Sequence, residues 1–369
     1  MIAVTIGVGP FYGEMARLAA ERVRTFTGLP TLILGDEAYR SHVDARHIAA
    51  IGPMASTALK TRLFELCPDY DDILYFDADL VFLAPWDPRA FAGTERFVCV
   101  RDSWYLDFIQ AEAARLGVPC ERYFNAGFFI ASREAHAGIL AESYRRFAEC
   151  YERGYGLFDQ GLLNLVFHEH GLPLHLLDRR YNFIGWALDS EVAREVSAFA
   201  AHCIRRRVRS SDKESTMAFL SGALPLPDQA PRAIDSDVAA ELRAMNACFG
   251  PVGEPGQCIE LREDFTIGGW SADVAFWYPL KGPAGTTLAL CGRDFFVCEL
   301  ARERDGVWRG RFPALHAPPG DAPKIATADW TRPRPLVRLM RQARRAAQAL
   351  LRRPSLERLA GRAVELRLD

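Results

Sequence analysis

Short apolar runs alternate with amphipathic helical patterns over the first two hundred residues of the chain. The runs predict strands at 3–6, 31–34, 73–76, 97–100 and 127–131. Apolar residues recur at helical spacing over 13–27, 58–66, 134–153 and 160–168. Because strands that alternate with helices are typical of βαβ units, this region is predicted to be an α/β domain on a mostly parallel sheet flanked by helices.

The pattern changes at residue 221. A Pro-rich stretch there predicts a linker, and a short helix is predicted near 238–247. Short apolar runs divided by turn residues then predict strands at 258–261, 287–290 and 295–298. A second Pro-rich stretch follows at 317–323. These changes predict four parts: an α/β domain (1–220), a linker with a short helix (221–250), a strand-rich module (251–315), and a linker with a basic helical tail (316–369).

Charge is distributed unevenly. The chain of 369 residues has a net charge of −2, so its overall charge gives no reason to expect nucleic acid binding. Residues 331–369 hold 11 Arg against three acidic residues, so the first 330 residues carry a net charge of −10. In this tail, apolar residues between Leu336 and Leu350 recur at helical spacing, with Arg338, Arg341 and Arg345 on the other side. Two interpretations stay open: a helix on an anionic membrane surface, or one packed on the body with a solvated Arg face.

Composition narrows the class of protein. Apolar residues make up 49% and charged residues 25%, an ordinary globular mixture. The nine Cys residues include no Cys-x-x-Cys pair, which argues against a disulfide framework or a zinc ribbon and favours a reducing compartment. No leader precedes the first strand-like run, and no apolar stretch approaches a membrane span. We therefore expect a cytoplasmic protein that could associate peripherally with the inner face of a membrane.

Two carboxylates stand at the end of an apolar strand. In Ile73-Leu-Tyr-Phe-Asp77-Ala-Asp79, one small residue separates the two Asp. Ligands of open α/β sheets bind at the carboxyl ends of strands. Closely spaced carboxylates bind a divalent cation well, and such a cation can neutralise a diphosphate leaving group. An acidic turn without function is the alternative, and an isolated Asp-x-Asp would favour it.

Further segments accompany this pair in a set order. They are Ala58-Leu-Lys60, Asp102, Arg122-Tyr-Phe-Asn125-Ala126-Gly127, Phe158-Asp159-Gln160-Gly161, Arg180-Tyr-Asn182-Phe183 and Ala201-His202. Together with Asp77-Ala78-Asp79, they resemble the retaining glycosyltransferases of the glycogenin and bacterial lipopolysaccharide galactosyltransferase family. The resemblance covers residues 1–210 and implies the Rossmann-like GT-A fold. It also implies a metal-dependent hexosyltransferase.

The resemblance implies a metal site and a nucleotide site. Asp77, Asp79 and His202 match the metal ligands, for Mn²⁺ or Mg²⁺. The residues expected near the nucleotide are Val8, Tyr12, Lys60, Asp77, Ala78 and Arg205. Tyr12 matches the aromatic residue that stacks on uracil, although packing beneath the start of a helix is an equally good interpretation from the residue alone.

Donor-sugar and catalytic residues are also implied. Asp102, Asn125, Ala126, Gly127 and Asp159 match groups around the donor sugar. Asp159 and Gln160 match residues near the anomeric carbon, and they are the catalytic candidates. From the residue types alone, Asn125 can be a turn residue and Asp159 a helix N-cap. A same-face mechanism and a covalent intermediate on Asp159 both remain open.

One segment departs from the family. The family has Gly and Lys three and six positions after the metal-binding His, whereas this chain has Arg205 and Val208. Arg205 or another nearby basic residue, such as Lys213, could bind the pyrophosphate instead.

The resemblance thus implies transfer of a hexose from a UDP-sugar to a glycan or glycolipid, in the synthesis of lipopolysaccharide or another cell-surface glycan. The alternatives are an inactive glycan-binding protein on the same scaffold and a sugar-phosphate nucleotidyltransferase.

Overall fold

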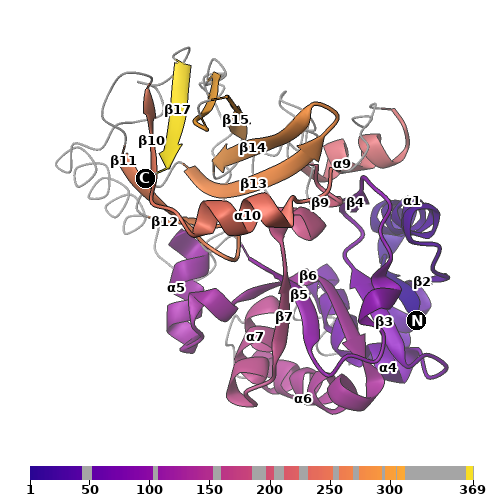
Figure 1. Cartoon of the computed structure of the whole chain (residues 1–369). Helices are drawn as coiled ribbons and strands as arrows, with labels where there is room; N and C mark the ends of the chain where they lie inside the picture. The colour runs from indigo at the N-terminus through magenta and orange to yellow at the C-terminus, as the bar shows by residue number, and fades with distance from the viewer. Residues whose placement is uncertain are drawn as a thin grey trace, which may run out of the picture. The chain divides into compact units, whose positions relative to one another are not determined.

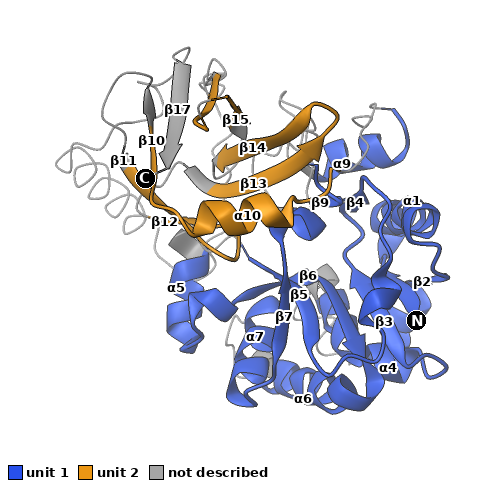
Figure 2. Cartoon of the chain, viewed as in Figure 1, with its two compact units in different colours: residues 1–231 blue, residues 232–369 orange. Residues whose placement is uncertain are grey.

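The computed structural model divides the chain into two compact units, residues 1–231 and 232–369 (Figure 2). The residues it describes are 1–43, 52–102, 107–152, 159–184, 197–202, 212–223, 232–251, 257–268, 274–292, 296–304, 306–311 and 363–368. Among these residues no helix is both long and apolar enough to cross a membrane.

The first unit is built on a six-stranded sheet with the order β2-β1-β3-β6-β5-β7 (Figure 1). Its strands are β1 (Ile2–Ile6), β2 (Thr31–Leu34), β3 (Asp72–Phe76), β5 (Phe97–Arg101), β6 (Phe124–Ser132) and β7 (Leu174–Leu177). The pairs β1–β2, β1–β3 and β5–β7 are parallel, while β6 runs antiparallel to both β3 and β5. The predicted α/β class with a mostly parallel sheet is therefore confirmed.

Both faces of this sheet are buried. Successive residues of a strand point to opposite faces, and in β3 Ile73 and Tyr75 join one apolar cluster while Leu74 and Phe76 join another. This two-sided burial explains why the strands appear in the sequence as continuous apolar runs. Buried residues of α1, such as Ala19, belong to the second cluster, and Leu140 of α6 belongs to the first.

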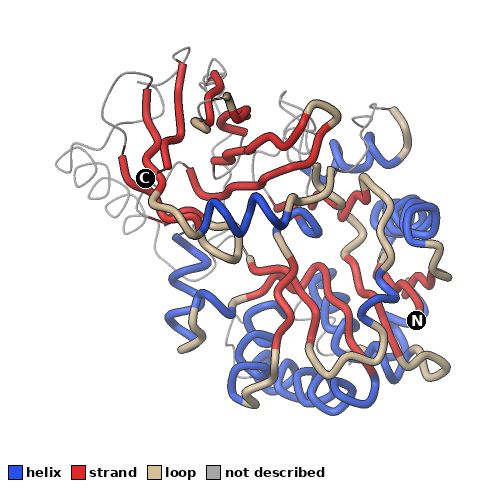
Figure 3. The backbone as a smooth tube through the Cα atoms, viewed as in Figure 1, coloured by secondary structure: helices blue, strands red, loops and turns tan. Residues whose placement is uncertain are grey.

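Helices surround the sheet and supply these apolar faces (Figure 3). The α-helices of the first unit are α1 (Gly9–Thr27), α2 (Asp36–His42), α4 (Leu63–Leu66), α5 (Asp107–Leu116), α6 (Arg133–Glu152), α7 (Asp159–Glu169) and α9 (Asp212–Leu220). The 3-10 helices are η1 (Gly52–Arg62), η2 (Pro88–Phe91), η3 (Cys120–Arg122) and η4 (Arg179–Asn182). Two expectations were inaccurate: α1 begins four residues before the predicted Gly13, because Pro10 suits a first helical turn, and most of 58–66 is a 3-10 helix.

A smaller sheet lies beside the end of β3. It contains β4 (Leu80–Phe82), β9 (Ala200–His202) and β8 (Phe183–Ile184), in the order β4-β9-β8. In its antiparallel β4–β9 pair, Leu80 stands opposite His202. This register brings a residue from position 202 next to the two carboxylates that follow β3.

The described residues of the second unit form an eight-stranded antiparallel sheet and the helix α10 (Ser236–Arg243). Its strands are β10 (Ala247–Pro251), β11 (Gln257–Leu261), β12 (Ile267–Gly268), β13 (Val274–Gly282), β14 (Gly285–Gly292), β15 (Phe296–Arg302), β16 (Trp308–Arg311) and β17 (Ala363–Leu368). The strand order is β12-β11-β10-β17-β16-β15-β14-β13, and an antiparallel bridge between Thr266 and Phe276 joins its two ends. Trp277 and Trp308 are fully buried in its core.

Two features of the second unit differ from the sequence expectations. Ala247, expected at the end of the short helix, begins β10 instead. Residues 363–368, expected within the helical tail, form β17, where apolar and charged residues alternate as in a strand. The predicted tail helix around 336–352 lies outside the described residues. The predicted boundaries at 220, 250 and 315 stay predictions.

Candidate active site

Three potential metal ligands converge after β3. Asp77 and Asp79 follow the strand directly, and one ligand atom from each of these residues and from His202 lies within 4.8 Å of the others. The Nε2 atom of His202 is 3.2 Å from Asp79 Oδ1 and 3.7 Å from Asp77 Oδ2. Asp79 and His202 are buried, whereas the side chain of Asp77 is 29% exposed. The structure therefore brings together the three residues predicted as metal ligands.

Backbone pairing fixes this convergence. The N–H of Asp77 donates to the carbonyl of Gly127 at 2.8 Å, which attaches the end of β3 to β6. The N–H of Leu80 donates to the carbonyl of Asp77 at 3.0 Å, so the chain turns at once into β4. β4 in turn pairs with β9 and holds His202 beside both carboxylates.

The chemistry of these donors fits a divalent cation. Two carboxylates and an imidazole suit Mn²⁺ well, and Mg²⁺ accepts the oxygen ligands. Burial opposes the charged form of His202, but the carboxylates of Asp79 and Asp77 outweigh it and raise the pKa of the imidazole. The ammonium of Lys213, on α9, contacts the second oxygen of Asp79. The site thus already attracts positive charge in the protein itself.

Lys60 bridges two of the carboxylates. Its Nζ lies 3.2 Å from Asp77 Oδ1 and 2.7 Å from Asp159 Oδ2, and it donates to the carbonyl of Ala126 at 3.3 Å. Lys60 is only 3% exposed; burial opposes its charge, but Asp159 and Asp77 outweigh that effect and raise its pKa. The hydroxyl of Tyr75 donates to Asp77 Oδ1 at 2.6 Å, and burial raises the pKa of this phenol, so it stays protonated as a donor. In this structure Lys60 therefore holds β3 and α7 together through their carboxylates.

Gly127 lies where the site leaves no room for a side chain. A Cβ atom added to Gly127 would lie 2.5 Å from His202 Cε1, 2.6 Å from Asp77 Oδ2 and 2.9 Å from Asn125 Oδ1. Ordinary contacts of a Cβ atom begin near 3.4 Å. Glycine is required here because His202 and Asp77, two of the predicted metal ligands, approach the β6 backbone closely.

The predicted sugar-binding residues contact one another. Asn125 Nδ2 donates to Gln160 Oε1 at 3.0 Å, and Gln160 Nε2 donates to Asp102 Oδ2 at 2.6 Å. The same Gln160 oxygen accepts the backbone N–H of Ala126 at 3.2 Å. The structure thus brings Asp102, Asn125, Asp159 and Gln160 into one polar cluster with the metal group.

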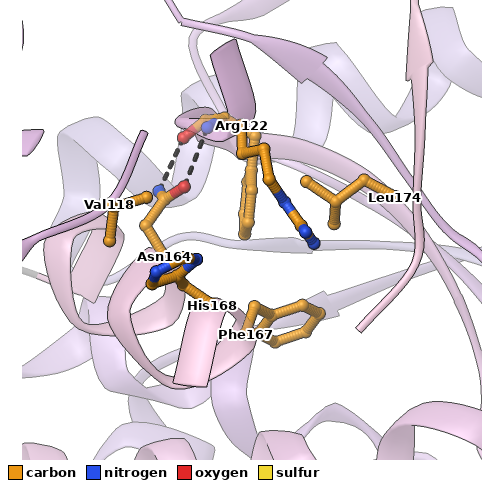
Figure 4. Close-up of a pocket in the computed structure, with 7 residues that line it drawn as sticks. Val118, Arg122, Asn164, Phe167, His168 and Leu174 are labelled. Carbon is orange, nitrogen blue, oxygen red and sulfur yellow. Dashed lines mark hydrogen bonds between the residues drawn. The ribbon is translucent and has the colours of Figure 1, made fainter. Parts of the chain in front are cut away.

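Helix α7, which carries Asp159 and Gln160, is attached to β6 by a third side chain. Asn164 accepts the N–H of Phe124 and donates to its carbonyl, each at 2.8 Å; both bonds are drawn as dashed lines in Figure 4. Asn164 and Phe124 line a small pocket together with Arg122, His168 and Leu174, and none of the predicted site residues lines it. The two Asn164 bonds attach α7 to β6.

The residues predicted near the nucleotide fall into separate groups: Lys60 contacts Asp77, whereas the others that the structure describes lie at or against α1. Tyr12 is 42% exposed in the first turn of α1, so it is not packed beneath the helix start. Val8 is the N-cap residue of α1, and Ala78 is buried against Met15 of the same helix. Arg205 lies outside the described residues.

A family comparison agrees with this geometry. Residues 54–202 match the family described as Glycosyl transferase family 8. This segment belongs to glycosyl transferase family 8. The resemblance inferred from the ordered motifs is thereby confirmed. The family 8 segment contains Lys60, Asp77, Asp79 and His202, together with the polar cluster of Asp102, Asn125, Asp159 and Gln160, which was predicted to bind the donor sugar and is called the sugar-side cluster below.

Solved structures of glycosyltransferases are also similar to the chain. The galactosyltransferase LgtC, in complex with donor and acceptor sugar analogs, has 16% sequence identity over 62% of this chain and 98% of its own, with a TM-score of 0.44. The bifunctional glycosyltransferase WbbM has 12% identity over 59% and 50% of the two chains, with a TM-score of 0.40. Mouse xyloside xylosyltransferase 1 has 12% identity over 55% and 96%, with a TM-score of 0.36. No curated protein sequence matches the chain.

Three contacts of the family 8 site and its surroundings were not predicted from the sequence. Tyr75 bonds to Asp77, Lys213 to Asp79, and Asn182 to His202. The segment 180–183 belongs to the resemblance, so Asn182 could have been singled out from its position in that order. Lys213 could not have been assigned to Asp79, because the sequence gives no measure of how far α9 lies from β3.

Proposed function

We propose that this family 8 chain is a metal-dependent hexosyltransferase that moves a hexose from a UDP-sugar to a hydroxyl group, with retention of configuration. The observation that carries the proposal is the convergence of Asp77, Asp79 and His202 at the end of β3, within the matched segment. Ligand sites of open α/β sheets lie at such strand ends.

Asp77, Asp79 and His202 would hold Mn²⁺ or Mg²⁺. When bound, the cation supplies charge neutralisation for the departing nucleoside diphosphate. Lys213 supports the same task, because its ammonium already lies at Asp79 and could contact phosphate oxygens once a cation occupies that carboxylate. Lys213 is thus our candidate to replace the Lys that the family has at the position of Val208, with Arg205 as the other candidate.

The sugar-side cluster would orient the donor. Asp102, Asn125 and Asp159 offer carboxylate and amide groups to sugar hydroxyls, and Gln160 offers its amide near the anomeric carbon. Lys60 holds Asp159 close to Asp77, since its ammonium lies within 3.2 Å of both carboxylates. Tyr12, exposed on α1, is available to stack on the uracil base. Most of the rate enhancement would come from positioning the acceptor hydroxyl and stabilising charge.

The acceptor would be a glycan or glycolipid, in the synthesis of lipopolysaccharide or another cell-surface glycan. The basic stretch 331–369 supports this part of the proposal, since 11 Arg residues suit an anionic membrane surface. A cytoplasmic enzyme that associates with the inner face of a membrane would meet such acceptors.

The experiment is a calorimetric titration of UDP into metal-free protein, with and without Mn²⁺. We expect binding that requires Mn²⁺ and that is lost in Asp79→Asn. The matched control is Asp69→Asn, an exposed carboxylate in the turn before β3, which should bind as the wild type does. Incubation with a panel of UDP-hexoses then identifies the donor by release of UDP. Equal UDP affinity with and without Mn²⁺, or equal behaviour of the two variants, would refute the site.

A further inference from the structure

A row of hydrogen bonds runs from the metal group to the end of β5. His202 Nδ1 lies 3.2 Å from Asn182 Oδ1, and Asn182 Nδ2 donates to Asn125 Oδ1 at 2.9 Å. From Asn125 the row continues through Gln160 to Asp102, by the two bonds described above. Three amides thus connect an imidazole with a carboxylate.

The direction of this row is determined at its far end. A carboxylate only accepts hydrogen bonds, so Gln160 must turn its NH₂ group toward Asp102 and its oxygen toward Asn125. Asn125 must then donate to Gln160 and present its own oxygen to Asn182. Two backbone groups enforce the same orientations, because the N–H of Ala126 donates to the Gln160 oxygen and the N–H of Gly127 donates to the Asn125 oxygen at 2.9 Å.

Asn182 passes this direction on to the histidine. Its NH₂ group is used toward Asn125, so its oxygen faces His202 Nδ1, which donates a proton to it. Nε2 faces Asp79 Oδ1 at 3.2 Å, and once a cation occupies the carboxylates it is the nitrogen left to offer a lone pair. Asn182 is fully buried at the end of η4, so it acts on the site through His202 and Asn125.

We propose that Asn182 is a positioning residue that holds the Nε2 lone pair of His202 toward the metal and couples the metal site to the sugar-side cluster. The part that concerns the sugar rests on the proposed function, whereas the part that concerns His202 rests on the donor chemistry alone. Partners of this kind around metal-binding histidines commonly change metal affinity when they are removed.

The first test measures Mn²⁺ affinity by calorimetry in the absence of nucleotide. Asn182→Ala should weaken Mn²⁺ binding about 10- to 100-fold. Asn182→Asp keeps an oxygen that accepts from Nδ1, so it should restore affinity to within about threefold of the wild type. His170→Ala is the control, because it removes an exposed histidine at the end of α7. Wild-type affinity in Asn182→Ala, or equal losses in both Asn182 variants, would overturn the proposal.

A separate variant tests the coupling between the metal site and the sugar-side cluster. Asp102→Ala leaves the metal ligands and Asn182 in place but removes the acceptor that directs the row. We expect a loss of Mn²⁺ affinity of about threefold, as for coupling through a hydrogen-bond network. Unchanged affinity would overturn the coupling to the sugar side.

A second measurement reads the wild type, and uses His202→Gln only to assign the signals of His202 by their loss. In ¹⁵N-histidine NMR of the protein loaded with Zn²⁺, a diamagnetic ion that binds imidazole nitrogen, the His202 ring should carry its proton on Nδ1. A proton on Nε2 of the loaded protein would overturn the proposal. Neither readout uses sugar transfer: a chain that binds Mn²⁺ as expected but no UDP would refute the proposed function and leave the assignment of Asn182 standing.

Discussion

Gly127→Ala adds one methyl group at the most crowded point of the site and changes no charge. The new Cβ would meet His202 Cε1 at 2.5 Å and Asp77 Oδ2 at 2.6 Å, where ordinary contacts begin near 3.4 Å. Gly127 belongs to β6 and its carbonyl pairs with Asp77, so the backbone cannot retreat without breaking that pairing. The histidine and the carboxylate must therefore move.

The size of the effect follows from these distances. Each of the two groups must shift by about 0.8–0.9 Å. A displacement near 1 Å of a group that must be precisely positioned costs roughly 10²-fold in reaction rate, and we expect a loss of similar size in metal binding. We expect Mn²⁺ affinity to fall by about 100-fold, equivalent to ~2.7 kcal/mol. Overpacking should also lower the free energy of unfolding by about 1–3 kcal/mol.

The assay combines Mn²⁺ calorimetry with urea unfolding of the metal-free protein. Gly138→Ala is the control, because a Cβ at this position of α6 would meet nothing within 4 Å. That change should leave Mn²⁺ binding intact and raise stability by about 0.5–1 kcal/mol, since Ala suits a helix better than Gly. If Gly127→Ala binds Mn²⁺ with wild-type affinity, Asp77, Asp79 and His202 do not share a metal ion.

Three further predictions concern other parts of the structure. Lys60→Met leaves the carboxylates of Asp77 and Asp159 without their buried cation, so it should lower the free energy of unfolding of the metal-free protein by about 3 kcal/mol. Mn²⁺ should restore part of this loss. Urea unfolding checks the prediction, and wild-type stability would contradict the role of Lys60. Because Asp79 and Asp77 raise the pKa of His202 against the opposing effect of burial, Mn²⁺ affinity should fall as the pH drops through that pKa. The stability that charged His202 gives the metal-free protein should be lost as the pH rises through the same value, and His202→Gln should flatten both profiles. Cys248 and Cys258 are opposite residues of β10 and β11 with their sulfur atoms 3.2 Å apart, so a disulfide reagent should link them; a peptide map with both thiols unlinked would contradict this.

Much of the first unit follows from its sequence because its strands are buried on both faces. Continuous apolar runs mark β1, β3 and β5 almost to the residue. The antiparallel direction of β6 does not follow, since an apolar run has no direction. Helix α5 and strand β7 also went unpredicted, because both are only partly buried and their apolar pattern is weak.

The candidate site shows a similar division. One residue separates Asp77 from Asp79, so local pattern and strand geometry suffice to place them together. His202 was found through the ordered resemblance, and the register between β4 and β9 explains its position. Asn182 and Lys213 act through long-range contacts with His202 and Asp79, which no local spacing encodes.

Strand β17 limits where the second unit can be truncated and affects how fast it folds. It lies between β10 and β16 in the interior of the sheet, although residues 312–362 separate it from β16 along the chain. Such a non-local insertion raises the contact order, so this unit should fold more slowly than its size suggests. A truncation before residue 363 would leave β10 and β16 as two open edges, which invite aggregation. A test of the basic segment for membrane binding should therefore replace its arginines and keep 363–368 in place.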